Sequence, residues 1–146
     1  MGHSQVKEAV ELFKSGCACS QAIAAVYAPP RGLDRAQALQ VAAGFGGGMH
    51  LGSTCGALTG AFIVLGLARG GADCATREGR QIVYNAVADL ARRFAARNGS
   101  TDCPDLLGCD ISTPEGMKKA QELGVMKSLC PKFVQDAAEI LEEMLG

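Results

Sequence analysis

Seven cysteines are the residues of this 146-residue chain that are best suited to chemistry. A thiolate binds soft metals and attacks disulfides, whereas a buried neutral thiol behaves as a small hydrophobic side chain. Five of the seven stand where we expect a helix to begin: Cys19, Cys55, Cys74, Cys103 and Cys130. The first turn of a helix presents unpaired N–H groups and partial positive charge, so this position favours thiolate over thiol. The pattern therefore predicts a set of activated thiols rather than scattered core cysteines.

The spacing of the cysteines excludes the common local metal modules. The chain has no Cys-x-x-Cys pair, only Cys17-Ala18-Cys19 and a five-residue gap between Cys103 and Cys109, and it has no Cys-x-x-Cys-His haem attachment motif. Cysteine is also only about 5% of the chain, below the ~8–10% of a small disulfide scaffold. A shared site would therefore have to be assembled by the fold from distant helix starts.

Two other features of the sequence have less specific chemistry. The glycine run 44–48 lacks both the spacing of a dinucleotide-binding loop and the Gly-Lys-Ser/Thr ending of a phosphate-binding loop. We interpret it as a turn in which backbones approach closely. His50 is the one histidine away from the N-terminus, and no partner that would orient it as a base is evident. We expect it to be an ordinary surface or core histidine.

Helical periodicity recurs along the chain without a convincing alternating segment. The expected helices run from Val6 to Phe13, Ser20 to Ala28, Arg35 to Ala43 and Ala57 to Ala68, from Asp73 or Thr76 to Asn98, from Thr113-Pro114, and from Cys130-Pro131 to Met144, with a short turn at Cys103-Pro104. The fold predicted is all-α, a single-domain bundle of about six to seven helices over residues 1–146. The apolar run Ala57 to Ala68 has 12 residues, against about 20 for a membrane span, so we expect it to be a central buried helix.

Composition and charge limit the possible partners. A formal net charge of -1 and a pI near 6.1 argue against a nucleic-acid binder, whose domain is strongly basic. Nothing near the start resembles a secretion signal, so we expect a cytoplasmic protein without membrane insertion. Residues 69–97 hold six basic and three acidic side chains, whereas residues 98–146 hold four basic and nine acidic ones. Such opposite patches fit a homodimer, in which the acidic C-terminal helix of one copy meets the basic patch of another.

Four segments of the chain together resemble a known family. They are Gly16-Cys17-Ala18-Cys19-Ser20-Gln21-Ala22, Thr54-Cys55-Gly56-Ala57-Leu58-Thr59-Gly60-Ala61, Cys103-Pro104-Asp105-Leu106-Leu107-Gly108, and Cys130 with Val134. In order and spacing they are similar to the C_GCAxxG_C_C family of redox-active proteins. The resemblance covers about residues 13–141 and implies that Cys19, Cys55, Cys103 and Cys130 are the signature cysteines and Gly56 and Gly60 the signature glycines. A related cysteine-rich domain occurs in split-Soret cytochromes, where it is associated with an iron–sulfur centre.

Three hypotheses remain open at this stage. In the first, Cys19, Cys55, Cys103 and Cys130 ligate an iron–sulfur cluster for electron transfer or sensing, and Gly56 and Gly60 lie next to the cluster. The cluster would exchange electrons with a redox partner protein that the sequence does not identify. In the second, two of these cysteines act as a metal-free thiol–disulfide oxidoreductase, which requires depressed thiol pKa values. In the third, the same residues bind zinc or a heavy metal without catalysis. The roles of Cys17, Cys74 and Cys109, and whether the chain is itself an enzyme, are left open.

Overall fold

The computed structural model describes residues 4–146, which form eight α-helices and no β-strand. The helices are α1 (Val6–Lys14), α2 (Cys19–Tyr27), α3 (Arg35–Ala42), α4 (Gly56–Arg69), α5 (Arg77–Asn98), α6 (Cys103–Leu107), α7 (Pro114–Leu123) and α8 (Val125–Leu145). Three 3-10 turns, Pro29–Arg31, Ala43–Phe45 and Gly47–His50, lie between α2 and α4. The prediction of an all-α fold is confirmed. No helix in residues 4–146 combines the length and apolar character that crossing a bilayer requires.

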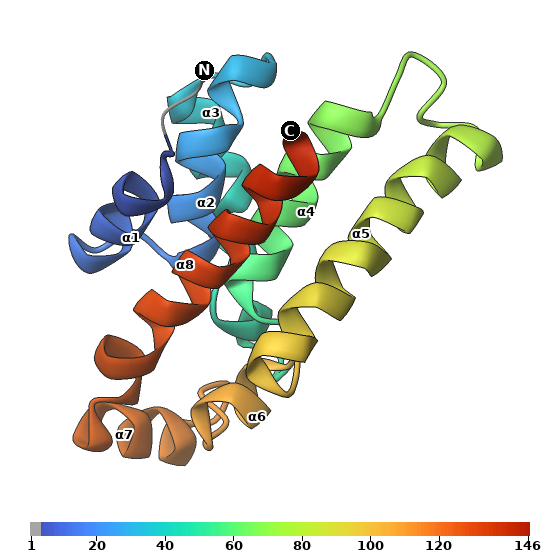
Figure 1. Cartoon of the computed structure of the whole chain (residues 1–146). Coiled ribbons are helices and arrows are strands. Elements are labelled where there is room, and N and C mark those ends of the chain that lie inside the picture. The colour runs from blue at the N-terminus through green and yellow to red at the C-terminus, as the bar shows by residue number, and fades with distance from the viewer. Residues whose placement is uncertain (1–3) are drawn as a thin grey trace.

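Helices α2, α4 and α8 form the middle of the bundle, as Figure 1 shows. Helix α5 runs along one side against α4 and α8, while α1 and α3 cover α2. The short helices α6 and α7 lie at one end of the bundle, which is also the end where α2 and α4 begin. The start of α2, the start of α4 and the whole of α6 are therefore close neighbours although they are far apart in the chain.

Helix α4 is the central buried helix expected from the run Ala57 to Ala68. Its first six residues, from Gly56 to Ala61, are all buried, as are Val64 and Leu65. Two glycines let α2 pack directly onto it: a Cβ at Gly60 would lie 2.6 Å from the carbonyl oxygen of Ser20, and a Cβ at Gly56 would lie 2.3 Å from the sulfur of Cys19. Such contacts are sub-van der Waals for carbon, so only glycine permits this approach. At Gly66, by contrast, a Cβ would meet nothing within 4 Å.

Polar side chains define several helix starts as the sequence predicts. The carboxylate of Asp34 accepts a hydrogen bond from the Gln37 N–H, and the hydroxyl of Thr113 accepts one from Gly116. Thr76, rather than Asp73, caps α5 by accepting from Gly79, and Gly99 ends that helix with a left-handed φ of 86°. Each interaction satisfies a backbone group that the helix itself leaves unpaired.

Two expected helix starts are wrong. Helix α8 begins at Val125, directly after the left-handed residue Gly124, so Cys130 lies in its interior and Pro131 is a proline inside the helix. A proline is favoured at the first position of a helix but is also tolerated within one when tertiary packing compensates for the lost hydrogen bond. Cys74 lies in the exposed turn before α5, outside the helix.

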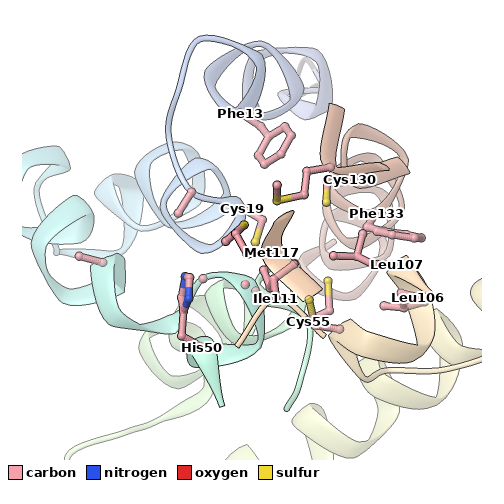
Figure 2. Close-up of a pocket in the computed structure, with 17 residues that line it drawn as sticks. Phe13, Cys19, His50, Cys55, Leu106, Leu107, Ile111, Met117, Cys130 and Phe133 are labelled. Atoms are coloured by element: carbon pink, nitrogen blue, oxygen red, sulfur yellow. The ribbon is translucent and has the colours of Figure 1, made fainter. Parts of the chain in front are cut away.

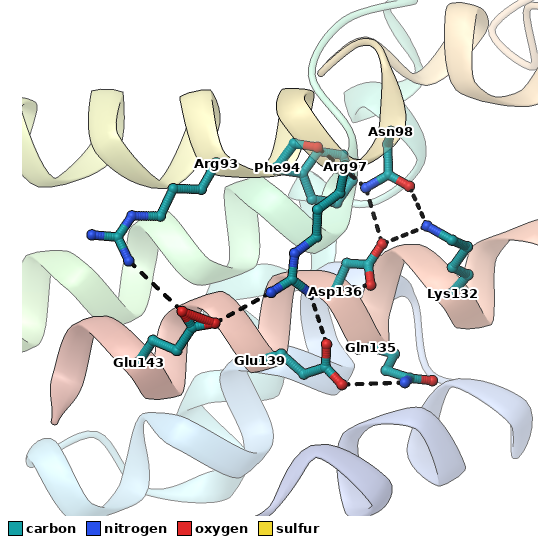
Figure 3. A network of polar contacts seen from close by, with 9 residues as sticks. All are labelled: Arg93, Phe94, Arg97, Asn98, Lys132, Gln135, Asp136, Glu139 and Glu143. Carbon is teal, nitrogen blue, oxygen red and sulfur yellow. Dashed lines mark hydrogen bonds and ion pairs between the residues drawn. The ribbon is translucent and has the colours of Figure 1, made fainter.

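Basic side chains of residues 69–97 form ion pairs with acidic side chains of residues 98–146 within the same chain. Arg97 of α5 pairs with Asp136, Glu139 and Glu143 of α8 at 3.4, 2.7 and 3.2 Å, as drawn in Figure 3. Asp136, only 7% exposed, also accepts from Lys132 and Asn98. These contacts join α5 to α8, so the charge pattern is not an argument for a homodimer.

Candidate functional site

The four signature cysteines line one cavity at the end of the bundle where α2 and α4 begin. Its volume is about 210 Å³. Besides Cys19, Cys55, Cys103 and Cys130 it is lined mostly by apolar side chains: Phe13, Leu106, Leu107, Ile111, Met117, Met126 and Phe133. Figure 2 shows Cys19 and Cys55 toward the middle of the view, Cys130 beside Phe13, and His50 on the opposite side. Cys19 of α2, Cys103 of α6, Cys130 of α8 and Cys55, the residue just before α4, therefore share a common space.

Cys19 is the first residue of α2 and is held by backbone on several sides. The backbone N–H groups of Gly47, Ser20 and Gly56 and its own N–H lower the pKa of its thiol, although burial raises that pKa by more. The Cys19 side chain fits there because Gly56 has no side chain. The side chain of Gln21 accepts from the Ala18 N–H and fixes the turn into the helix. This environment agrees with the expected role of a helix start in presenting N–H groups to a sulfur.

Cys55 and Cys103 are positioned by a reciprocal pair of backbone hydrogen bonds. The Cys55 N–H donates to the carbonyl of Thr101, and the Cys103 N–H donates to the carbonyl of Ser53, both at 2.8 Å. The N–H of Ala57 bonds to the Cys55 sulfur. These contacts fix the starts of α4 and α6 relative to each other, although almost fifty residues separate them in the chain.

The glycine run forms a tight wall of the cavity. Gly47 and Gly48 have φ of 58° and 66°, values that glycine adopts without strain. A Cβ at Gly48 would lie 2.9 Å from the Cys103 Cβ, so the backbone passes close to that cysteine. Met49 and His50 also have positive φ, at 59° and 52°, which costs roughly 1–2 kcal/mol for each residue. The interpretation of this run as a close-approach turn agrees with these contacts.

His50 lines the cavity although its residue is largely exposed to solvent. Its ring lies near Gly47, where a Cβ would be 3.5 Å from Nε2. No local signal places His50 beside the cysteines, because the path of its loop depends on the left-handed residues before it. Met117 and Met126 were likewise not singled out, since methionine is a common residue in cores.

Burial raises the pKa of each of the four thiols. The pKa of Cys103 rises to about 11 and that of Cys130 to about 12, first because each thiol is removed from water and then because Cys19 lies nearby. The pKa values of Cys19 and Cys55 are raised by the same desolvation. The expectation of depressed thiol pKa values is therefore wrong. Hydrogen bonds from N–H groups lower the pKa of Cys19 and Cys55, but desolvation in an apolar cavity outweighs them.

The donor set is that of a thiolate-ligated metal centre. Four sulfurs and no carboxylate line the cavity, which is the ligand type that iron–sulfur clusters use. Within residues 4–146, however, no three His, Cys, Asp or Glu side chains form a group that could hold one metal ion. Zinc would gather its four sulfurs at about 2.3 Å from one point.

The remaining sequence-predicted residues lie outside this cavity lining. Gly60 packs against the backbone of Ser20, so its contact is with helix α2. Cys74 is exposed, and Cys17 is half-buried against the core. Cys109 is buried near Cys103 and points its thiol toward the carbonyl of Leu107, 3.7 Å away. The division between four signature cysteines and three others thus coincides with a division in space.

A comparison with family models gives one match to this chain. The family model described as "Putative redox-active protein (C_GCAxxG_C_C)" matches residues 17–144, which is nearly the whole chain. No curated protein and no solved structure gives a significant match. The chain therefore belongs to the C_GCAxxG_C_C family of redox-active proteins.

Proposed function

We propose that the four cavity cysteines ligate an iron–sulfur cluster that serves electron transfer or sensing. The observation that carries the proposal is the common cavity of Cys19, Cys55, Cys103 and Cys130, which come from three different helices and from the residue just before a fourth. Four thiolates match the ligand count of a two-iron or a four-iron cluster. Membership of a redox-active family agrees with this chemistry.

A cluster is favoured over a single zinc ion by the arrangement of the sulfurs. In a cluster each cysteine binds an iron at its own corner, so the sulfurs surround a larger object and stay farther apart than around one ion. A cavity of about 210 Å³ lined by four thiols, without a group that could hold one ion among residues 4–146, agrees with that requirement.

A metal-free dithiol mechanism is less well supported, because it needs thiols that ionise near neutral pH. The Cys103 and Cys130 pKa values of about 11 and 12 mean that both would be protonated there. Iron bound at the site would supply positive charge that favours the thiolate form.

The protein's own groups would control the bound cluster. When bound, such a cluster supplies one-electron oxidation and reduction. The N–H groups of Gly47, Ser20 and Gly56 bond to the Cys19 sulfur and would stabilise the more negative, reduced state. Phe13 and Phe133 provide apolar walls at the side of the cavity where Cys130 lies.

Anaerobic purification after reconstitution with iron and sulfide tests the proposal. We expect a brown protein with sulfur-to-iron charge-transfer absorption and with iron and acid-labile sulfide in equal amounts. A colourless product without iron would refute the proposal, and one zinc ion per chain would replace it by the zinc hypothesis.

Two serine variants test which cysteines are involved. Cys55→Ser removes a buried cavity thiol, whereas Cys74→Ser changes an exposed thiol in the turn before α5. We expect the first to lose the cluster and the second to retain the full iron content. Equal iron loss in both variants would contradict the assignment of the cavity cysteines as ligands.

A further inference from the structure

The four cavity cysteines are not equally supported by the backbone. Cys19 receives N–H hydrogen bonds from three other residues, and Cys55 receives one from Ala57. The Cys55 N–H donates to Thr101, just before Cys103, and the Cys103 N–H donates to Ser53, just before Cys55. Among the described residues, no N–H group contributes to the pKa of Cys103 or Cys130, but the backbone of Cys103 is held by its hydrogen bond to Ser53.

Cys130 also lies in the least firmly held part of its helix. The first six residues of α8 lie between two breaks in regular structure: Gly124, with φ of 67°, and Pro131. Proline has no N–H, so it cannot donate to the carbonyl of Lys127 four residues earlier. None of residues 125–130 is fully buried, whereas Phe133 and Val134 belong to the core.

The exposure of the four cysteine residues, taken as whole residues, separates Cys130 from the others. Cys19, Cys55 and Cys103 have only 9%, 6% and 7% of their surface exposed, whereas Cys130 is half-buried. Figure 2 shows Cys130 next to Phe13 of α1, at the side of the cavity formed by α1 and α8. An outward movement of the segment 125–130 would open this side at the cost of the contacts that Val125, Met126 and Leu129 make with the core.

We infer that Cys130 is the exchangeable ligand of the site and that its release lets a small exogenous thiol bind in its place. Cys19, Cys55 and Cys103 are the three permanent ligands. The inference rests on the proposed cluster. Release and binding exchange one thiolate for another: Cys130 takes up a proton, the incoming thiol gives one up, and no electron is transferred. A thiol suits this position because the adjoining walls are apolar and rich in methionine and phenylalanine, so a strongly hydrated oxyanion would lose its water there without compensation.

Alanine variants of single cysteines separate permanent ligands from exchangeable ones. We expect Cys130→Ala to keep most of the wild-type iron and sulfide after anaerobic reconstitution, and Cys19→Ala to lose nearly all of it. 2-Mercaptoethanol added to C130A is expected to change the visible circular dichroism and electron paramagnetic resonance spectra saturably. Acetate, as a hard anionic control, is expected to leave both spectra unchanged. Far-ultraviolet circular dichroism establishes that each variant is folded.

A variant that leaves all cysteines intact gives a second measurement. Pro131→Ala restores the N–H that α8 lacks, so the segment before it should open less often. During brief treatment of the reconstituted wild-type protein with iodoacetamide, followed by mass spectrometry, Cys130 should be labelled several-fold faster than the other three cavity cysteines. P131A should slow that labelling without changing the iron content.

The outcomes distinguish this inference from the proposed function. A wild-type protein that takes up no cluster refutes both. If the wild-type protein does take up a cluster, any one of three results refutes the role of Cys130 alone. These are equal iron loss in C130A and C19A, equal labelling of the four cavity cysteines, and no spectral response of C130A to 2-mercaptoethanol. The cluster proposal would then stand unchanged.

Discussion

Replacing Gly56 by alanine tests the packing that places Cys19 in the cavity. The new Cβ would lie 2.3 Å from the Cys19 sulfur, 2.8 Å from the Gly46 Cα and 3.1 Å from the Gly47 nitrogen. An ordinary van der Waals contact is at least about 3.4 Å, so the sulfur would have to move by about 1 Å and the Gly46 backbone by about half as much. Overpacking of this kind costs about 1–3 kcal/mol. Glycine-to-alanine replacement at the start of α4 offsets at most about 1 kcal/mol of this cost.

Two other glycines of α4 are matched controls. A Cβ at Gly66 has open space, so Gly66→Ala should stabilise the protein by about 0.5–1 kcal/mol. A Cβ at Gly60 would lie 2.6 Å from the Ser20 carbonyl oxygen and 2.9 Å from its Cα, both backbone atoms. Gly60→Ala should therefore destabilise the protein by about 2 kcal/mol or more, although Gly60 does not line the cavity.

Urea unfolding of the reduced, metal-free proteins measures these free energies, and iron content after reconstitution measures the site. For a chain of this size a loss of about 2 kcal/mol lowers Tm by roughly 4–8 °C. G56A should lose iron beyond what its stability explains, because its Cβ displaces a ligand, whereas G60A of similar stability should retain more. A G56A protein as stable as G66A, with full iron content, would refute the packing argument.

Three further predictions concern the folded state without metal. The free energy of unfolding should fall as pH rises above about 9, by about 1.4 kcal/mol per pH unit for each affected thiol. The reason is that a thiol in the unfolded chain has a pKa near 9.0, whereas the pKa values of Cys103 and Cys130 in the folded chain are about 11 and 12. A urea midpoint unchanged between pH 8 and pH 10 would contradict this. Asp136→Ala should lower the free energy of unfolding by about 1–3 kcal/mol, because three donors converge on its buried carboxylate. The control Arg92→Ala, at a side chain 73% exposed, should change it by less than about 0.5 kcal/mol. Equal effects of the two variants in thermal melts would argue against the network. Ser20→Ala should cost about 1–2 kcal/mol, since its buried hydroxyl donates to the Ala42 carbonyl at 2.8 Å, and a neutral result in urea unfolding would show that this carbonyl finds another partner.

Local signals in the sequence were sufficient for most of the fold. The caps Asp34, Thr76 and Thr113 and the terminating glycine Gly99 act within a few residues, so their effect can be predicted without tertiary contacts. The run Ala57 to Ala68 could be assigned to the core because its composition requires burial. The resemblance to the C_GCAxxG_C_C family identified the four residues that share the cavity, whereas helix-start position alone also included Cys74.

Cys130 shows where local reasoning was insufficient. The pair Cys130-Pro131 is compatible with a helix start and with a proline inside a helix, and only the left-handed Gly124 six residues earlier decides between them. That glycine ends α7 and leads directly into α8, so the two helices share a one-residue connection. The choice depends on how α8 packs against α1 and α5, which is information that a window of sequence does not contain.

The direction of the thiol pKa shifts depends on tertiary burial in the same way. A helix start does supply N–H groups, as Cys19 and Cys55 show, but the local effect is smaller than the cost of ionising a sulfur inside an apolar cavity. The same burial strengthens electrostatic interactions at a bound centre, because little water screens its charge. N–H groups around Cys19 would then influence the centre's potential more than they would at the surface. The features that make these thiols poor nucleophiles without metal are thus the ones that would let the protein tune a cluster.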